Sequence, residues 1–412
     1  MSRSLPQKSI RLEGSGPAAA LCAAALSQMR GRLGIDISGM LKPANFGEQP
    51  PVILGPQSLK LLSAMGLSER DLIKACAGTF AVGAKFAHAG FCPFIDSAPV
   101  MNGVALHQIY SKVKTPAPYS ACFTAAHMAN ADKFVHPSGD DDYRYSIVLD
   151  AGLFEHYMQR AAAHYGFKPA ADDTRANITL RAELSTDNIK TEKSPDATMP
   201  VSLVYDAGKD GITATACTQS HKYISRANKT AVDAPDMWTG NIIDAGAALT
   251  PLHPLDHSYM DAMAFSLQSL FNIWPAGDDA SLARAEFNRR TGSFIARSAD
   301  YQSALLILAG AQDEDSAQDS LKTKLTQFLS RGRLVSFDDE PVSDAEWVAY
   351  LIAAGAKQAR TDPLTAQFSA DKPADIIKGR KEHAQNQADG MMAQSEYLAA
   401  SDALCAAGKV AS

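Results

Sequence analysis

The pattern of apolar and polar positions predicts a strand, a tight turn and a helix at the start of the chain. Apolar and polar residues alternate over Lys8–Glu13, as they do in a short β-strand. The motif Gly14-Ser-Gly16-Pro-Ala-Ala19 follows, and small apolar residues then continue to Leu26. Glycines before a helix of alanines allow a sharp turn and a helix that lies close against its strand.

The same patterns divide the rest of the chain into strands and helices. Helical spacing bounded by turn residues predicts helices over Gly55–Gly66, Ser68–Cys76 and Asp150–Gly166. Ser68 and Asp150 are the expected N-caps of the last two. Strand patterns predict strands at Gly34–Pro43, Thr79–Ala87, Asn177–Leu184 and Met199–Tyr205. From Asp256 to about Ala407 the pattern is mainly helical.

Strands and helices in this order indicate an α/β fold. We predict a Rossmann-like unit that binds FAD or NAD(P) and is built from residues 7–90, 142–184 and 238–280. A β-rich layer over the substrate is expected from residues 91–141 and 185–237, where proline, glycine and polar residues interrupt the pattern. A helical C-terminal region is expected from residues 281–412.

Composition narrows the class of protein. With 412 residues and 46% hydrophobic residues, the chain can form about two or three structural units around a large core. The net charge of −6 is spread along the sequence, so no basic groove for nucleic acid is expected. No signal-peptide pattern or membrane-spanning apolar run is present, and we expect a cytoplasmic protein. Six cysteines without a C-x-x-C motif are expected to be reduced and buried, with no zinc site.

Gly14, Gly16 and Ala19 are the candidate cofactor residues. In a dinucleotide-binding fold the first glycine makes the turn, the second lets the backbone approach a pyrophosphate, and the third position allows close packing of helix on strand. The free N–H groups of the helix N-terminus attract the anion. An acidic residue for the ribose is expected at the end of the next strand, but Gly39–Lys42 offers none. A plain glycine turn before an alanine-rich helix is the alternative.

Several segments match the motifs of one family in order and spacing. Leu54–Leu59, Met65–Asp71 and Thr79–Phe86 are similar to a Gly-Glu-Ala-Thr segment, a Leu-Gly helix start and a Thr-Phe-Lys strand. Tyr143–Phe154 and Ile243–Asp256 are similar to a Tyr-x-Tyr-x-x-Asp-Ala helix start and a second flavin motif that ends in Pro-Leu-Glu. Weaker similarities follow at Glu286–Arg290, Val342–Gly355 and Met391–Leu398. The chain therefore resembles the flavin-dependent tryptophan halogenases.

The resemblance implies a cofactor, a substrate class and a second set of site residues. In that family reduced FAD reacts with oxygen, a halide is oxidised to hypohalous acid, and a lysine directs the halogen onto an aromatic carbon while a glutamate assists. The resemblance implies FAD as cofactor, a small aromatic substrate and a separate flavin reductase. It also implies that Gly246 and Ala247 lie beside the flavin and that Asp256 stands at the position of the glutamate.

The sequence departs from the family where halogenation takes place. The lysine position falls at Ala81, which can neither donate a hydrogen bond nor carry a halogen. Lys85 follows about 13 Å further along the strand, and we expect it to face solvent. The family's Trp-x-Trp segment falls at Ile212–Cys217, which has no tryptophan, and the glutamate of Gly-Glu-Ala-Thr falls at Pro56. The resemblance thus implies the fold but not halogenation.

The segment His253-Pro-Leu-Asp256-His257 places two histidines and a carboxylate close together in the sequence. A metal site is one interpretation, but Pro254 argues against a regular helix and no third ligand is identifiable, so we expect no metal. We favour a loop beside the flavin in which Asp256 and His257 contact the substrate. These two are the candidate catalytic residues.

The sequence leaves different classes of function open. The first is a divergent FAD-dependent oxidoreductase or monooxygenase that acts on an aromatic or indole-like substrate. The second is a non-catalytic binding or scaffold protein that has lost FAD, as the missing ribose acid and Ala81 would allow. Plain hydroxylation is a further outcome, because the tryptophans that hinder it are absent. We expect no nucleic acid or membrane partner, and a homodimer stays open.

Overall fold

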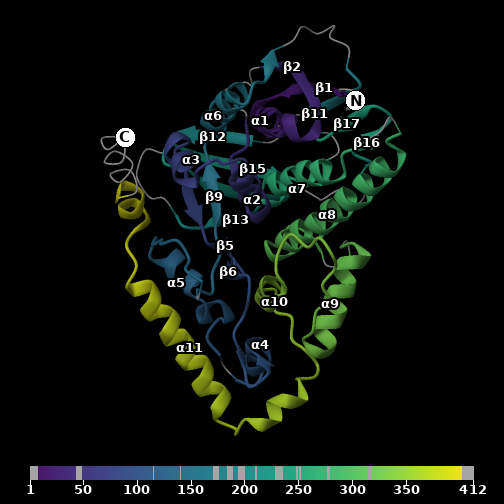
Figure 1. Cartoon of the computed structure of the whole chain (residues 1–412). Helices are drawn as coiled ribbons and strands as arrows, with labels where there is room; N and C mark the ends of the chain where they lie inside the picture. The colour runs from purple at the N-terminus through teal and green to yellow at the C-terminus, as the bar shows by residue number, and fades with distance from the viewer. Residues whose placement is uncertain are drawn as a thin grey trace.

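A mostly parallel sheet forms one end of the molecule in the computed structural model (Figure 1). Its strand order is β10-β2-β1-β11-β17-β16, and only β16 runs antiparallel to its neighbour. The strands are β1 Lys8–Ser15, β2 Ile35–Lys42, β10 Lys168–Pro169, β11 Ile178–Ala182, β16 Trp238–Thr239 and β17 Ile242–Asp244. This arrangement confirms the predicted α/β, Rossmann-like fold class.

The structure describes most of the chain. The described residues are 8–42, 49–114, 116–139, 141–169, 176–182, 189–193, 200–208, 211–227, 235–246, 249, 252–275, 279–313, 315 and 317–400.

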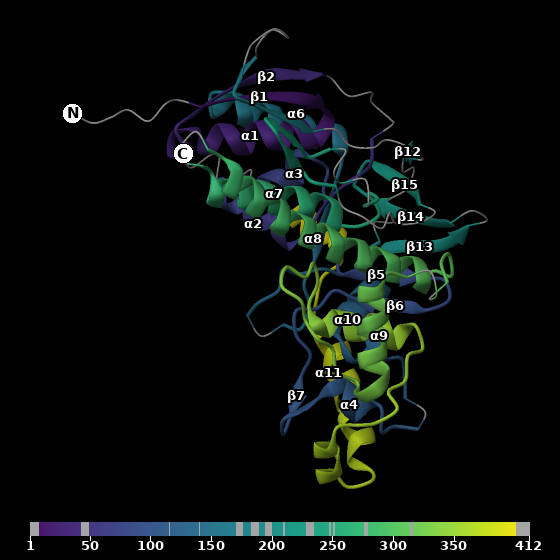
Figure 2. The ribbon, with the colours of Figure 1, turned by 90° about the vertical axis from the view of Figure 1, so that its right-hand side faces the viewer.

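Helix α1, Gly16–Leu33, is the central helix of this unit. It packs against β1, β2, α6 (Ala151–His164) and α7 (Ser258–Ile273), as Figure 2 shows. Every residue over Gly16–Ser27 is buried, and half of these residues are alanines, whose small side chains let the helix lie close to its neighbours. The helix ends where Gly34 adopts a left-handed conformation with φ 63°.

A second six-stranded sheet lies beside the first, with the order β12-β15-β14-β13-β5-β6. Its strands are β5 Gly83–Phe86, β6 Gly90–Pro93, β12 Ile189–Lys193, β13 Leu203–Gly208, β14 Gly211–Cys217 and β15 His221–Ala227. The pairing of β13 with β5 joins the predicted substrate layer to residues assigned to the FAD unit. The predicted domain boundaries stay a prediction.

A small third sheet has the strand order β3-β9-β4. It contains β3 Val52–Leu54, β4 Thr79–Ala81 and β9 Ser146–Leu149. The segment Thr79–Ala87, predicted as one strand, is therefore two strands in different sheets. They separate at Val82, whose N–H donates to the carbonyl of Val201 and whose carbonyl accepts from the N–H of Phe94.

Short helices connect these sheets and cover their ends. The predicted caps hold, because Ser68 accepts from the Asp71 N–H and Asp150 from the Leu153 N–H. The connecting elements are α2 Pro56–Ala64, α3 Glu69–Ala75, β7 Val100–Met101, β8 Val104–Ala105, α4 Leu106–Tyr110, the 3-10 helix Tyr119–Cys122 and α5 Thr124–Asn130.

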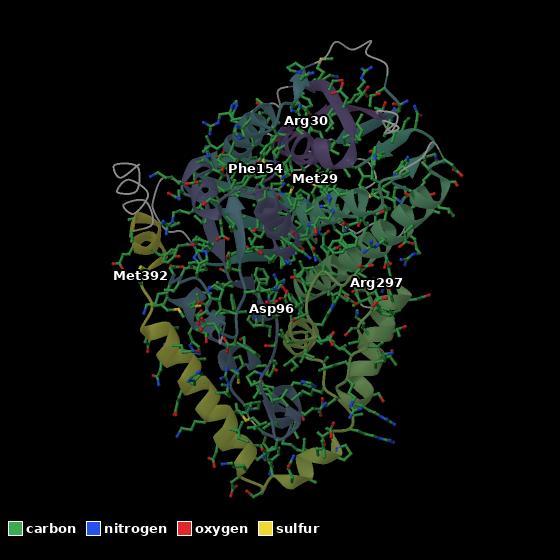
Figure 3. The ribbon with its side chains drawn as sticks, in the orientation of Figure 1. Met29, Arg30, Asp96, Phe154, Arg297 and Met392 are labelled. Carbon is green, nitrogen blue, oxygen red and sulfur yellow. The ribbon has the colours of Figure 1, made fainter. Side chains whose placement is uncertain are left out.

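The C-terminal region is helical, as predicted. Its helices are α8 Ser281–Leu308, α9 Asp319–Arg331, α10 Asp344–Ala353, the 3-10 helix Pro363–Gln367 and α11 Lys372–Asp389. Its first helix packs against α7, and α9 to α11 form the other end of the molecule together with α4 and β7 (Figures 1 and 2). After α11 the chain passes Met392, labelled in Figure 3, and returns to β4. There the Phe80 N–H donates to Gln394 Oε1 over 2.7 Å in a buried contact.

Cysteines within the described residues form no disulfide. Cys22, Cys76, Cys92 and Cys122 are buried and Cys217 is half-buried, whereas Cys405 lies outside the described part. Burial raises the pKa of the Cys22 thiol to about 12, so it stays protonated. No helix in the described ranges combines the length and apolar character needed to cross a membrane.

Candidate functional site

The glycine turn between β1 and α1 has the close contacts that its sequence predicts. A Cβ at Gly14 would lie 2.0 Å from the carbonyl oxygen of Ala182 on β11 and 3.0 Å from the Cβ of Ala19. Gly16 has φ 70°, in the left-handed region that favours glycine. Only small residues fit this junction of β1, β11 and α1, so the motif is built into the fold.

The N-terminus of α1 is suited to an anion. Ser15 makes no side-chain cap, and the first turn carries no acidic residue. The N–H groups of that turn therefore keep their capacity to bind a phosphate. A Cβ at Gly16 would lie 2.8 Å from the side-chain nitrogen of Gln49. Gln49 is buried, and its Oε1 has no hydrogen-bond partner within the described ranges. The residues of the turn suit a pyrophosphate. The Gln49 carboxamide lies directly against Gly16 of the turn.

The structure describes the other predicted cofactor positions only in part. The described end of β2, Gly39–Lys42, carries no acidic side chain for a ribose, and residues 43–48 lie outside the described part. Gly246 is buried just after β17, where its carbonyl accepts from the Leu249 N–H over 3.1 Å. Ala247 lies outside the described residues. The cofactor assignment of these positions stays a prediction.

Ala81, at the family's lysine position, is enclosed by apolar side chains. It ends β4, is 1% exposed and belongs to a buried cluster with Val148, Leu255 and Tyr301. Lys85 lies beyond the break at Val82, on β5, with its side chain exposed as predicted. Neither position therefore offers an amine next to Asp256.

Asp256 is a buried carboxylate directly before α7. Its Oδ1 accepts from the N–H of Ser258 over 2.7 Å, from the Ser258 hydroxyl, and from Gln302 Nε2 over 3.3 Å. Its Oδ2 is buried and has no hydrogen-bond partner among the described residues. One oxygen thus caps the helix and fixes the side chain, while the other remains able to accept a proton or a hydrogen bond.

His257 is fully buried and lies between a cation and a carboxylate. Its Nε2 lies 3.4 Å from Arg144 Nη2, and its Nδ1 lies 3.2 Å from Asp261 Oδ2. Because a guanidinium can only donate, Nε2 is assigned as the acceptor and Nδ1 carries the proton. The described residues contain no group of three side chains placed to hold a metal ion. His257 thus contacts Arg144 and Asp261, and its assignment as a catalytic residue stays a prediction.

Asp261 contacts His257 on one side and the N-terminal end of α2 on the other. This end of α2 lies in the segment that stands in place of the family's Gly-Glu-Ala-Thr motif. Its Oδ1 accepts from the N–H groups of Gly55 and Ser58 over 3.2 and 2.9 Å and from the Ser58 hydroxyl over 2.6 Å. Burial alone would raise the pKa of Asp261, but His257 and Ser58 outweigh it and hold that pKa below its usual range. The N-terminus of α2 is therefore already occupied by a protein carboxylate.

An ion pair that the sequence analysis missed lies beside His257. Arg144 donates to Glu346 from Nε over 3.1 Å and from Nη2 over 2.9 Å, and the Glu346 side chain is 0% exposed. Glu346 also accepts from the Ile95 N–H over 3.1 Å and from the Tyr301 hydroxyl over 3.2 Å. Burial raises the pKa of Glu346, against the opposing effect of Arg144.

Buried tyrosines surround these charges. Tyr301 and Tyr350 share a hydroxyl–hydroxyl hydrogen bond of 2.8 Å, and the Tyr205 hydroxyl donates to the Leu255 carbonyl over 3.0 Å. Burial and the nearby acidic groups raise the pKa values of all three phenols, so they remain neutral donors. These phenols and charged groups form a buried polar network next to Asp256.

Comparisons with known proteins place the chain in a family. Its sequence matches the family described as tryptophan halogenase over residues 9–216 and 171–370. A search of curated protein sequences finds no match.

Solved halogenase structures share the whole fold. BrvH, a flavin-dependent halogenase from Brevundimonas sp. BAL3, is 17% identical with a TM-score of 0.80, over 96% of this chain and 99% of its own. Xcc4156, a flavin-dependent halogenase from Xanthomonas campestris, is 15% identical with a TM-score of 0.80, over 95% and 98%. The tryptophan 6-halogenase SttH from Streptomyces toxytricini is 14% identical with a TM-score of 0.80, over 96% and 100%. At these identities the likeness establishes the fold, and with the sequence match it shows that the chain belongs to the tryptophan halogenase family.

Proposed function

We propose that the chain binds FAD and acts as an oxidoreductase on a small aromatic or indole-like molecule, without halogenating it. The observation that carries this proposal is the turn of Gly14, Gly16 and Ala19 at the uncapped N-terminus of α1. Its close contacts leave room only for small residues, and its free N–H groups suit a pyrophosphate. Gly246 and Ala247 would lie beside the flavin ring, as the family motif suggests.

The flavin, when bound, supplies the redox chemistry, and a separate reductase would deliver its electrons as in the family. The protein's own contribution centres on Asp256. Substitution at an aromatic carbon releases the proton of that carbon, and the buried Oδ2 of Asp256 can accept it. Ser258 and Gln302 hold the other oxygen and fix the direction of the carboxylate. His257 keeps the neighbouring Arg144 and Asp261 in place.

Halogenation is excluded from the proposal because the site has no amine at the required position. The Ala81 methyl group is packed in the core, and the exposed Lys85 belongs to another sheet. β14, where the family's Trp-x-Trp segment falls, carries no tryptophan. Hydroxylation of the aromatic ring is the oxidation that this residue set would permit.

A non-catalytic binding or scaffold protein is the second candidate, and two contacts favour it. Gln49 lies against Gly16 where a pyrophosphate would approach, and Asp261 already occupies the N-terminus of α2. In both cases a protein side chain lies where a ligand would otherwise contact the N-terminus of a helix. In this case the protein would act by binding a partner, and the fold would remain without its cofactor.

The visible absorbance spectrum of the purified protein tests the proposal. It is recorded before and after FAD is added and the excess removed by desalting. We expect the wild-type protein to retain flavin and Gly16→Val to lose it. Circular dichroism of the variant shows whether the strain of a side chain at φ 70° also changes the fold. Gly379→Val in α11, where a Cβ would meet nothing within 4 Å, is the control for adding a β-branched side chain at a helical glycine.

A wild-type protein that stays colourless and does not quench flavin fluorescence would refute the FAD proposal. Co-purification with a partner protein would then be the measurement that examines the scaffold candidate. If the flavin is retained, product analysis with a reductase, oxygen, halide and indoles separates hydroxylation from halogenation.

A further inference from the structure

A pocket of about 520 Å³ lies at the N-terminal end of α10. It is formed by the loop after β6, the start of α4, the segment before α10 and the first turns of α10. Figure 3 labels Asp96, which lies on its wall near α10, between the two ends of the molecule. Its volume is within the range of small-molecule sites.

The charged groups of the pocket wall are all acidic. Asp96, Glu340 and Asp344 line it, and no lysine or arginine does. His107 also lines it, and its Nε2 lies 2.6 Å from the Gly332 carbonyl oxygen. Burial lowers the pKa of His107, so the ring is neutral near pH 7 and adds no positive charge. The wall thus suits a cation and disfavours an anion.

All three carboxylates have partners, but the partners of Glu340 and Asp344 lie closer than the Arg144 guanidinium lies to Asp96. Glu340 pairs with Lys324 and accepts from Trp347 Nε1 over 3.1 Å. Both oxygens of Asp344 accept from the Ser336 hydroxyl over 2.7 Å.

Asp96 is the carboxylate that retains capacity for a ligand. Its side chain is 80% exposed, and its nearest cationic group, Arg144 Nε, lies 3.7 Å away, beyond hydrogen-bond distance. An ammonium group in the pocket would therefore meet Asp96 first.

The rest of the wall is largely apolar. Phe337, Val342 and Val348 contribute aromatic and branched side chains, and Ala98 and Ala105 leave space between them. Lys324 Nζ and the Arg297 guanidinium lie 4.7 and 4.4 Å from the Phe337 ring centroid and fix that ring. An apolar molecule with one positive end fits such a wall.

The pocket adjoins the buried charged cluster through Ile95 and Arg144. The Ile95 N–H donates to Glu346, and its carbonyl accepts from the Ser343 hydroxyl over 2.5 Å. Arg144 extends from Asp96 on the pocket wall to His257, next to Asp256. A series of contacts through Arg144 and His257 therefore connects the pocket wall to the segment that carries Asp256.

We propose that this pocket binds an aromatic molecule that carries an amine and no carboxylate, with its ammonium group at Asp96 and its ring against Phe337 and Val348. The inference narrows the substrate class and rests on the proposed function only where it treats this ligand as the substrate. Binding itself requires no flavin.

Calorimetric titration of the flavin-free protein at neutral pH tests the inference, with tryptamine and indole-3-propionate as a matched pair of opposite charge. We expect tryptamine to bind and indole-3-propionate to bind at least about tenfold more weakly. Asp96→Asn should weaken tryptamine binding about fivefold, as expected for a partly exposed ion pair. Ala98→Trp should abolish binding by filling the pocket. Asp36→Asn, an exposed carboxylate on β2, is the control and should bind as the wild type does.

Equal affinity for the two indoles, no binding of either, or full affinity in Asp96→Asn would each overturn the inference. The result is independent of the cofactor. Tryptamine binding to a protein that never retains FAD would refute the proposed oxidoreductase and leave the pocket assignment standing.

Discussion

Replacing Glu346 with leucine should destabilise the protein by about 3–5 kcal/mol, because it leaves a buried guanidinium without its partner. The carboxylate is 0% exposed and accepts hydrogen bonds from Arg144, Tyr301 and the Ile95 N–H. The Arg144 side chain is 7% exposed, and after the replacement Asp96, at 3.7 Å, is the carboxylate that still pairs with it among the described residues. Water cannot compensate a charge in this position without opening the structure.

Urea unfolding followed by tryptophan fluorescence gives the free-energy change, with the m-value as a check on cooperativity. The double variant Arg144→Met/Glu346→Leu removes both charges and should recover most of the loss, since paired apolar side chains replace a buried ion pair at little cost. A loss below about 1 kcal/mol in Glu346→Leu would refute the reasoning. It would mean that solvent and Asp96 together compensate the Arg144 charge once Glu346 is replaced.

Three further predictions concern other parts of the molecule. Gly14→Ala should lower the free energy of unfolding by about 3 kcal/mol, because its Cβ would lie 2.0 Å from the Ala182 oxygen, and an unchanged melting temperature would contradict this. Gln394→Ala should cost about 1–3 kcal/mol in urea unfolding, because the buried Phe80 N–H loses its acceptor. Burial lowers the pKa of His107, so the unfolded state binds its proton more readily. Stability should therefore fall as the pH drops below about 6.5, less steeply in His107→Gln, and equal urea midpoints at low and neutral pH would rule this out.

Local features of the fold could be predicted because they depend on neighbours in the sequence. The strand, turn and helix of β1 and α1 follow from alternation, two glycines and small residues, and the structure has them as predicted. Ser68 and Asp150 cap their helices because a short polar side chain before a helix can reach an N–H within the first turn. Trp347 is 0% exposed, as the helical spacing of the apolar residues around it indicates.

Features that depend on distant residues could not be predicted in this way. The break at Val82 arises because its N–H and carbonyl bond to Val201 and Phe94, and no local pattern shows this. Arg144 and Glu346 are 202 residues apart in the sequence. Glu346 also stands three residues after Ser343, the spacing of a helix cap, so its sequence context indicates an exposed first-turn residue rather than a buried partner of Arg144.

The contact between Gln394 and Phe80 has a consequence for how the protein is made. The two residues are 314 positions apart, so β4 is synthesised long before its last buried hydrogen-bond acceptor exists. During translation the N-terminal elements form first. The strand that ends at Ala81 gains its contact with the segment after α11 only when that segment has been synthesised. A nascent or truncated chain that stops before Gln394 therefore leaves the Phe80 amide without this acceptor. The hydrogen bonding of β4 is completed only near the end of synthesis.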